Sequence, residues 1–163
     1  MCRNEKLLAS ETRKIKRIFP DIDSLIVDDE GLEYKEYRIS IFTHCLTREE
    51  ANKLLDNISK NIERIRTVKL QRFILALCKE FDSYLIIYNQ KKKTFEYKQV
   101  MSENDIKLSH SMVSNGNRVK LVIPSLKAVY LENWDFTHLF YFKNKKILAR
   151  FEYLVKKKGL YII

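Results

Sequence analysis

The alternation of apolar and polar residues predicts a helix and two strands in the first part of this chain. Residues 4–19 place apolar side chains at helical spacing, and Pro20 ends the predicted helix. Residues 34–43 alternate between apolar and polar positions, which is typical of a half-buried strand. Between these segments, the apolar residues of 22–27 predict a second, short strand.

A long amphipathic helix is predicted to begin after Thr47 and to end near Arg66. Thr47 and Glu50 have the spacing of a capping box, in which each side chain satisfies a free backbone N–H at the start of a helix. One apolar stripe continues along this helix, formed by Ala51, Leu54, Leu55, Ile58, Ile62 and Ile65. We expect four members of the stripe to pack against a sheet: Leu54, Leu55, Ile58 and Ile62.

The rest of the chain predicts mainly strands, followed by a final helix. Residues 68–81 predict an irregular or extended start and then a helix, and 102–111 predict a loop with a helical turn. Strands are predicted over 84–88, 94–100, 118–123, 128–131, 136–142 and 160–163. The last helix is expected over 145–158, with Asn144 capping its start and Gly159 its end. Because strands and helices do not alternate one for one, the predicted fold class is α+β, with a mainly antiparallel sheet and packed helices.

Composition restricts the class of protein. The 163 residues, 45% of them hydrophobic, fit one domain over 1–163 with a single core. No apolar run reaches the roughly 18 to 20 residues that span a bilayer, and the charged first residues predict no signal peptide. Three cysteines without close spacing argue against a disulfide framework, so we expect a reduced, cytoplasmic protein. The three glycines are too far apart for a phosphate-binding loop, which excludes nucleotide-dependent enzymes of the Walker and dinucleotide-binding types.

The charge is strongly positive but unevenly distributed. The net charge is +10, yet residues 21–56 contain ten acidic and four basic side chains. Such an acidic stretch is typical of a solvated loop, of paired carboxylates that hold Mg²⁺, or of a patch that meets a basic protein surface. The basic remainder is typical of a solvated lysine-rich surface or of a surface that binds nucleic acid. The acidic side chains near the start of this stretch are Asp21, Asp23, Asp28, Asp29, Glu30, Glu33 and Glu36.

The histidines supply the candidate catalytic groups. His44 and Cys45 are adjacent, but neighbours in an extended chain point to opposite faces, so they do not form a nucleophile–base pair. His138 is a candidate general base with an orienting carboxylate, although a hydrogen-bonded sheet residue is the commoner role; in a strand, Asp135 and Thr137 face the other way. His110 is the one other histidine that could act with His138 in a nuclease. No cluster of ligand side chains has metal-site spacing, so we expect no catalytic site, metal or cofactor.

The C-terminal part of the chain carries a resemblance to a known family. Residues 133–142, with the sequence NWDFTHLFYF, precede a basic amphipathic helix and the ending KGLYII of residues 158–163. This pattern resembles the end of immunity proteins from bacterial polymorphic-toxin systems, including contact-dependent growth inhibition. The helix opening LTREEA at 46–51 is also similar. The resemblance covers about a fifth of the chain, and it implies a cytoplasmic protein that binds the nuclease domain of a toxin and blocks its active site.

Three functions stay open at this point. The first is an immunity protein without enzymatic activity. Such proteins are often acidic against nuclease toxins, so either the acidic stretch alone binds the toxin or the toxin surface is itself acidic. We expect the seven carboxylates named above to form the interface, with Asp28, Asp29 and Glu30 near its centre. The second is a lysine-rich nucleic-acid-associated protein, with binding that is weak and independent of sequence. The third is an enzyme that uses His110 or His138.

Overall fold

One antiparallel sheet organises the part of the chain that the structure describes. The computed structural model describes residues 9–22, 25–26, 34–56, 58–89, 94–100, 102–106, 118–143 and 148–163. Within these ranges seven strands follow the order β3-β2-β4-β5-β6-β1-β7, and every neighbouring pair is antiparallel. The strands are β1 (Lys35–Ser40), β2 (Tyr84–Asn89), β3 (Thr94–Gln99), β4 (Lys120–Ile123), β5 (Ala128–Leu131), β6 (Thr137–Phe142) and β7 (Tyr161–Ile162). The predicted α+β class with a mainly antiparallel sheet is confirmed.

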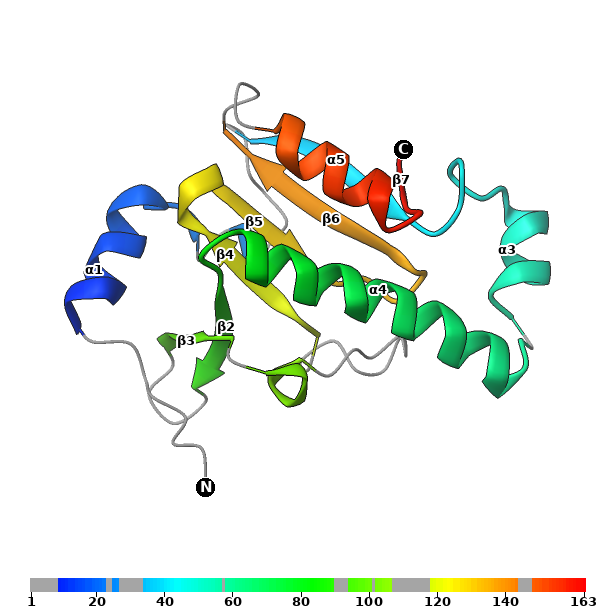
Figure 1. Cartoon of the computed structure of the whole chain (residues 1–163), viewed down its shortest axis with the longest axis horizontal. Coiled ribbons are helices and arrows are strands. Elements are labelled where there is room, and N and C mark those ends of the chain that lie inside the picture. The colour runs from blue at the N-terminus through cyan, green and yellow to red at the C-terminus, as the bar shows by residue number, and fades with distance from the viewer. Residues whose placement is uncertain are drawn as a thin grey trace.

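Helices pack on both faces of this sheet. They are α1 (Ala9–Ile18), α3 (Arg48–Leu54), α4 (Lys60–Glu80) and α5 (Ala149–Lys157), with 3₁₀ turns at Glu103–Asp105 and Pro124–Leu126. In Figure 1, α4 and α5 run next to each other across the sheet, and α1 lies apart from them. The ring centroids of Phe73 in α4 and Phe151 in α5 are 6.0 Å apart, which confirms that these two helices touch.

Alternate residues of the central strands belong to two apolar cores on opposite faces of the sheet. In β4, Leu121 belongs to the core under α4 and α5, whereas its neighbour Val122 belongs to the core under α1. The first core includes Phe73 and Phe151. The second core includes Phe19, which follows α1 directly. The central strands are therefore buried on both faces.

The short strand predicted over 22–27 is wrong. Ile22, Leu25 and Ile26 have helical backbone, and the N–H of Leu25 donates to the carbonyl of Asp21 at 3.1 Å. All three apolar side chains are buried in the second core, while Val27 lies outside the described residues. A short apolar run that is buried all round has no periodicity that distinguishes a strand from a helical turn.

The predicted capping box is confirmed, but the single helix that should follow it is wrong. Glu50 N–H donates to the Thr47 hydroxyl at 3.3 Å, and the Glu50 carboxylate accepts from the Thr47 N–H at 2.9 Å. The helix that begins there, α3, ends at Leu54. A new helix, α4, starts after Ser59, whose hydroxyl accepts from the Ile62 N–H at 3.3 Å. This second N-cap restarts the helix and so interrupts the predicted stripe.

The interruption changes which members of the stripe are buried. Leu55 and Ile58 pack against the first core as partly buried side chains, and Leu54 is half-buried. Ile62 and Ile65 are 43% and 59% exposed, so the prediction that Ile62 packs on the sheet is wrong. They occupy the first turns of α4, ahead of the segment that contacts the sheet.

The buried face of α4 begins later than the predicted stripe. Leu70, Phe73, Ile74 and Leu77 are fully buried at the spacing i, i+3, i+4 and i+7 of a helix that packs on a core. The helix is continuous through Val68, where the sequence predicted an irregular or extended start. Contact with the sheet therefore selects the helix over residues whose local pattern was ambiguous.

The C-terminal elements agree with the prediction over the described residues. Gly159 has φ of +67° after α5, its N–H donates to Lys156 at 2.9 Å, and the Leu160 N–H donates to Val155 at 3.1 Å. These two bonds form a Schellman motif, which favours glycine at the left-handed position. The motif directs the chain back into β7, which pairs with β1. Asn144, the predicted cap at the start of the helix, lies outside the described residues.

The remaining predicted strands are also confirmed. Those over 84–88, 94–100, 118–123, 128–131 and 136–142 correspond to β2 through β6, with ends that differ by at most two residues. The helical turn predicted within 102–111 is present at Glu103–Asp105.

Candidate functional site

The described members of the predicted acidic interface have partners within the chain. The Tyr34 hydroxyl donates to Oδ1 of Asp21 at 3.0 Å, and Lys143 Nζ lies 3.5 Å from the same oxygen. Glu36 accepts from Nε of Arg38 at 2.6 Å. These two carboxylates are thus partly compensated before any partner binds. The other five predicted interface residues lie outside the described residues: Asp23, Asp28, Asp29, Glu30 and Glu33.

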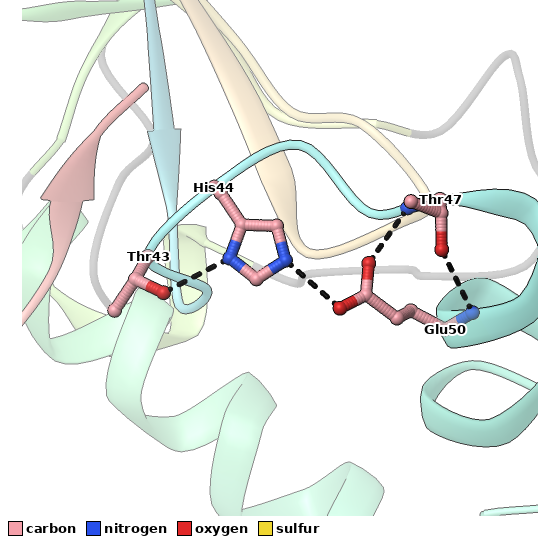
Figure 2. A network of polar contacts seen from close by, with 4 residues as sticks. All are labelled: Thr43, His44, Thr47 and Glu50. Carbon is pink, nitrogen blue, oxygen red and sulfur yellow. Dashed lines mark hydrogen bonds and ion pairs between the residues drawn. The ribbon is translucent and has the colours of Figure 1, made fainter.

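Figure 2 shows that His44 belongs to the capping network of α3. Its Nε2 lies 3.0 Å from one oxygen of Glu50, and its Nδ1 lies 3.1 Å from the Thr43 hydroxyl. The other Glu50 oxygen accepts from Thr47. The pKa of Glu50 is held below its usual value. The largest cause is the hydrogen bond from the Thr47 backbone N–H, and the hydrogen bond with His44 is the second. Because Glu50 is ionised at neutral pH, this exposed network orders the loop between β1 and α3 there.

His138 is enclosed by the first core. It is fully buried, and its Nδ1 lies 2.5 Å from the hydroxyl of Tyr130, which is also fully buried. The nearby Asp135 carboxylate accepts from the backbone N–H of Thr137 at 3.0 Å. The described contacts therefore give His138 the role of a hydrogen-bonded sheet residue, and they do not assemble the base–carboxylate pair. His110 lies outside the described residues.

A basic groove lies between α4 and the end of α5. It has a volume of about 680 Å³ and is lined by Arg64, Ile65, Val68, Lys69, Arg72, Lys157 and Lys158. Five of these seven side chains are cationic and none is acidic. Within the described ranges, none of the five cations forms an ion pair with a carboxylate. Over the described residues, the groove therefore presents five cations beside the aliphatic side chains of Ile65 and Val68.

The tertiary fold brings the two sides of this groove together. The α4 side chains come from one helical face, because residues three and four apart are neighbours on a helix. The Schellman turn at the end of α5 lies beside α4, since a Cβ atom on Gly159 would lie 3.5 Å from the Lys69 side chain. The sequence shows a basic run at 156–158, but nothing in it connects that run with α4. The basic residues at 64, 69 and 72 were the signal that sequence reasoning missed.

The two described cysteines differ in burial. Burial raises the pKa of the Cys78 thiol to about 11, an effect that a hydrogen bond with Ser83 opposes, whereas Cys45 is exposed. We expect iodoacetamide at pH 7.5 to alkylate Cys45 at least about a hundred times faster than Cys78, because the thiolate is the reactive species. Peptide mass spectrometry over a time course measures both rates. In denaturant the two rates should converge, and equal rates in the native protein would contradict the burial of Cys78.

Neither a metal centre nor a membrane segment is found in the described ranges. No three His, Cys, Asp or Glu side chains there gather as metal ligands. No helix there has both the length and the apolar character needed to cross a bilayer. No family model, curated protein or solved structure matches this chain.

Proposed function

We propose that this chain is a binding protein that neutralises a protein partner in the cytoplasm, as the resemblance to immunity proteins implies. The observation that carries the proposal is the groove between α4 and α5, where five cations without described ion-pair partners surround Ile65 and Val68. An apolar centre with a charged rim is the usual anatomy of a protein interface. A partner with an acidic surface would therefore gain both apolar burial and charge complementarity here.

Nucleic-acid association is the second candidate function, and the same five cations favour it. Single-stranded nucleic acid is usually bound on aromatic side chains that stack with the bases. The apolar side chains that line this groove, Ile65 and Val68, are aliphatic, which favours a protein partner. Salt dependence separates the two candidates, because contacts with several phosphates would lower nucleic-acid affinity by about 10³-fold or more between 50 and 200 mM salt. Tight nucleic-acid binding at physiological salt would promote this second function.

The test of the proposed function uses the protein encoded beside this chain. A large secreted protein with a toxic C-terminal domain, encoded immediately upstream, is the partner that an immunity protein requires. Co-expression of this chain with that isolated domain is expected to restore growth, and the purified proteins are expected to form a complex. Growth arrest that persists although the chain is folded and abundant would contradict the proposal.

Variants of the chain then locate the interface. Neutralising Arg64, Lys69 and Arg72 to glutamine is expected to weaken partner binding by about ten- to a hundredfold, since each central charge contact contributes on the order of 1 kcal/mol. Neutralising the three lysines at 91–93 removes the same charge elsewhere and is expected to change affinity by less than about twofold. Titration calorimetry on each variant measures the difference.

The acidic-interface prediction has the opposite signature in the same assay. Replacing Asp28, Asp29 and Glu30 by Asn, Asn and Gln should slow association and reduce protection if those carboxylates meet a basic toxin. If this variant loses affinity while the groove variant keeps it, the partner surface is basic and the acidic segment is the interface. If only the groove variant loses affinity, the partner surface is acidic and the prediction from the sequence is wrong.

A further inference from the structure

The first half of α4 has no buried side chain. Its buried residues begin at Leu70, although the helix starts at Lys60. In Figure 1 these first turns extend past the ends of the strands toward α3. Arg66 connects this half of the helix to the preceding part of the chain. Its guanidinium donates to the Leu54 carbonyl and lies 5.3 Å from the ring centre of Phe42. The apolar side chains of these first turns are therefore left open to further packing.

An apolar stripe leads along this segment into the groove. Ile62 is 43% exposed, Ile65 is 59% exposed, and Val68 is half-buried. The three residues are spaced three apart, so their side chains form a continuous ridge along one side of the helix. Ile65 and Val68 also line the groove. The stripe and the groove are therefore parts of a single surface.

On the side of α4 that faces the groove, the charged side chains beside the stripe are all basic. Residues 60–72 carry five basic side chains and one acidic side chain, Glu63. Glu63 is nine residues from Arg72, which is half a turn at about 100° per residue, so it lies on the side of α4 away from the groove. Lys157 and Lys158 add charge from α5. An occupant of this surface must therefore be acidic as well as partly apolar.

We propose that the groove and the exposed stripe of α4 together bind an acidic amphipathic helix of the partner protein. This inference rests on the proposed function and names the element that the partner contributes. A ridge of side chains three apart accommodates a second helix laid alongside it. Arg64 and Arg72 are eight residues apart, about 12 Å along the axis, which is a little over two turns. The partner helix then carries carboxylates at intervals of one to two turns on both sides of an apolar stripe.

The direct test uses a synthetic peptide as a stand-in for the partner helix. One fluorescent peptide carries leucines along a helical stripe with glutamates on both sides, and a second is a scrambled sequence of the same composition. Fluorescence anisotropy with the full chain is expected to show tighter binding of the amphipathic peptide by about tenfold or more, because only that peptide can bury its leucines on the stripe. Equal binding of both peptides would overturn the helix assignment, because charge attraction would then be sufficient to explain the binding.

Variants place the peptide on the chain. Arg64→Glu with Arg72→Glu is expected to weaken peptide binding by about ten- to a hundredfold. Ile65→Ser, which leaves every charge in place, is expected to weaken it by several-fold to about tenfold. The matched control is Lys14→Glu with Arg17→Glu, which reverses two exposed charges on α1, and it should keep affinity within about twofold. Circular dichroism confirms that each variant is folded. Equal losses in the control and groove variants would overturn the site.

Other occupants give different results. A single-stranded oligonucleotide that binds the chain more tightly than the peptide does, and that loses this affinity in the Arg64→Glu, Arg72→Glu variant, would identify nucleic acid, and not a partner helix, as the occupant. A dimer in solution that Arg64→Glu with Arg72→Glu dissociates would replace the partner helix with a second copy of this chain. If the peptide does not bind but the chain still neutralises its partner, the inference fails and the proposed function stands. If the peptide binds at the groove and neutralisation fails, the surface stands and the proposed function fails.

Discussion

Replacing Phe151 by alanine is expected to lower the free energy of unfolding by about 3–5 kcal/mol, the usual range for a fully buried phenylalanine. The Phe151 ring is 0% exposed and stacks on Phe140 with centroids 3.8 Å apart. It also meets Phe73 edge-on at 6.0 Å. The substitution thus removes a contact of α5 with the sheet and with α4 at once, and it leaves a cavity that three elements surround. Equilibrium unfolding in urea, followed by circular dichroism, measures the loss.

The matched control for this substitution is Tyr153→Ala on the same helix. The Tyr153 side chain is 63% exposed, and we expect its removal to change stability by about 0.5 kcal/mol or less. If Phe151→Ala were no more destabilising than this control, α5 would not be packed on the sheet as described. The comparison also matters for function, because α5 contributes Lys157 and Lys158 to the groove. A loosened α5 should weaken partner binding as well.

Removing the hydroxyl of Tyr130 is expected to lower the free energy of unfolding by about 1–3 kcal/mol, although the substitution to phenylalanine changes one atom. The hydroxyl lies 2.5 Å from Nδ1 of His138, and both side chains are fully buried. Burial, above all, raises the pKa of Tyr130 well above its ordinary value. The phenol therefore keeps its proton and can donate it to Nδ1 when the imidazole is protonated at Nε2. Without the hydroxyl, Nδ1 loses this partner in a site closed to water.

A double-mutant cycle separates this hydrogen bond from packing. His138→Leu is made in the wild-type chain and in the Tyr130→Phe chain, and urea unfolding is measured for all four proteins. We expect the two losses to be less than additive by about 1 kcal/mol or more, because either substitution breaks the same contact. Tyr153→Phe removes an exposed hydroxyl and is expected to be neutral within about 0.5 kcal/mol. Additive losses in the cycle would show that the two groups are not coupled.

The local pattern of the chain was sufficient wherever one residue type has a single low-energy role. Thr47 and Glu50 form the expected capping box because both partners come from the same helical turn. Gly159 ends α5 because the left-handed conformation after a helix favours glycine. The strands of the sheet were predictable because alternating side chains must point to opposite faces. These features depend on neighbours within a few residues, all of which are visible in the sequence.

Local pattern failed where burial decided between two conformations. The apolar run at 22–27 was predicted as a strand, yet Leu25 is helical and buried under the sheet. Ile62 was assigned to a continuous stripe, but the Ser59 cap restarts the helix and leaves it exposed. Leu25 is buried by contacts with distant parts of the chain. The exposure of Ile62 follows from the direction that α4 takes after its cap. Propensity is a weak guide under those conditions, because tertiary packing overrides it.

The sequence by itself determined the fold class, the positions of the strands that form the sheet and the basic character of the chain. The tertiary structure alone decided which charges act together. The groove joins Arg64, Lys69 and Arg72 to Lys157 and Lys158, which lie more than eighty residues further along the chain. The tertiary structure also buries His138 of β6 beside Tyr130 of β5, and the two side chains are in contact there. Charge and hydrogen bonding depend on distance in space, and only the packing of α4, α5 and the sheet sets those distances.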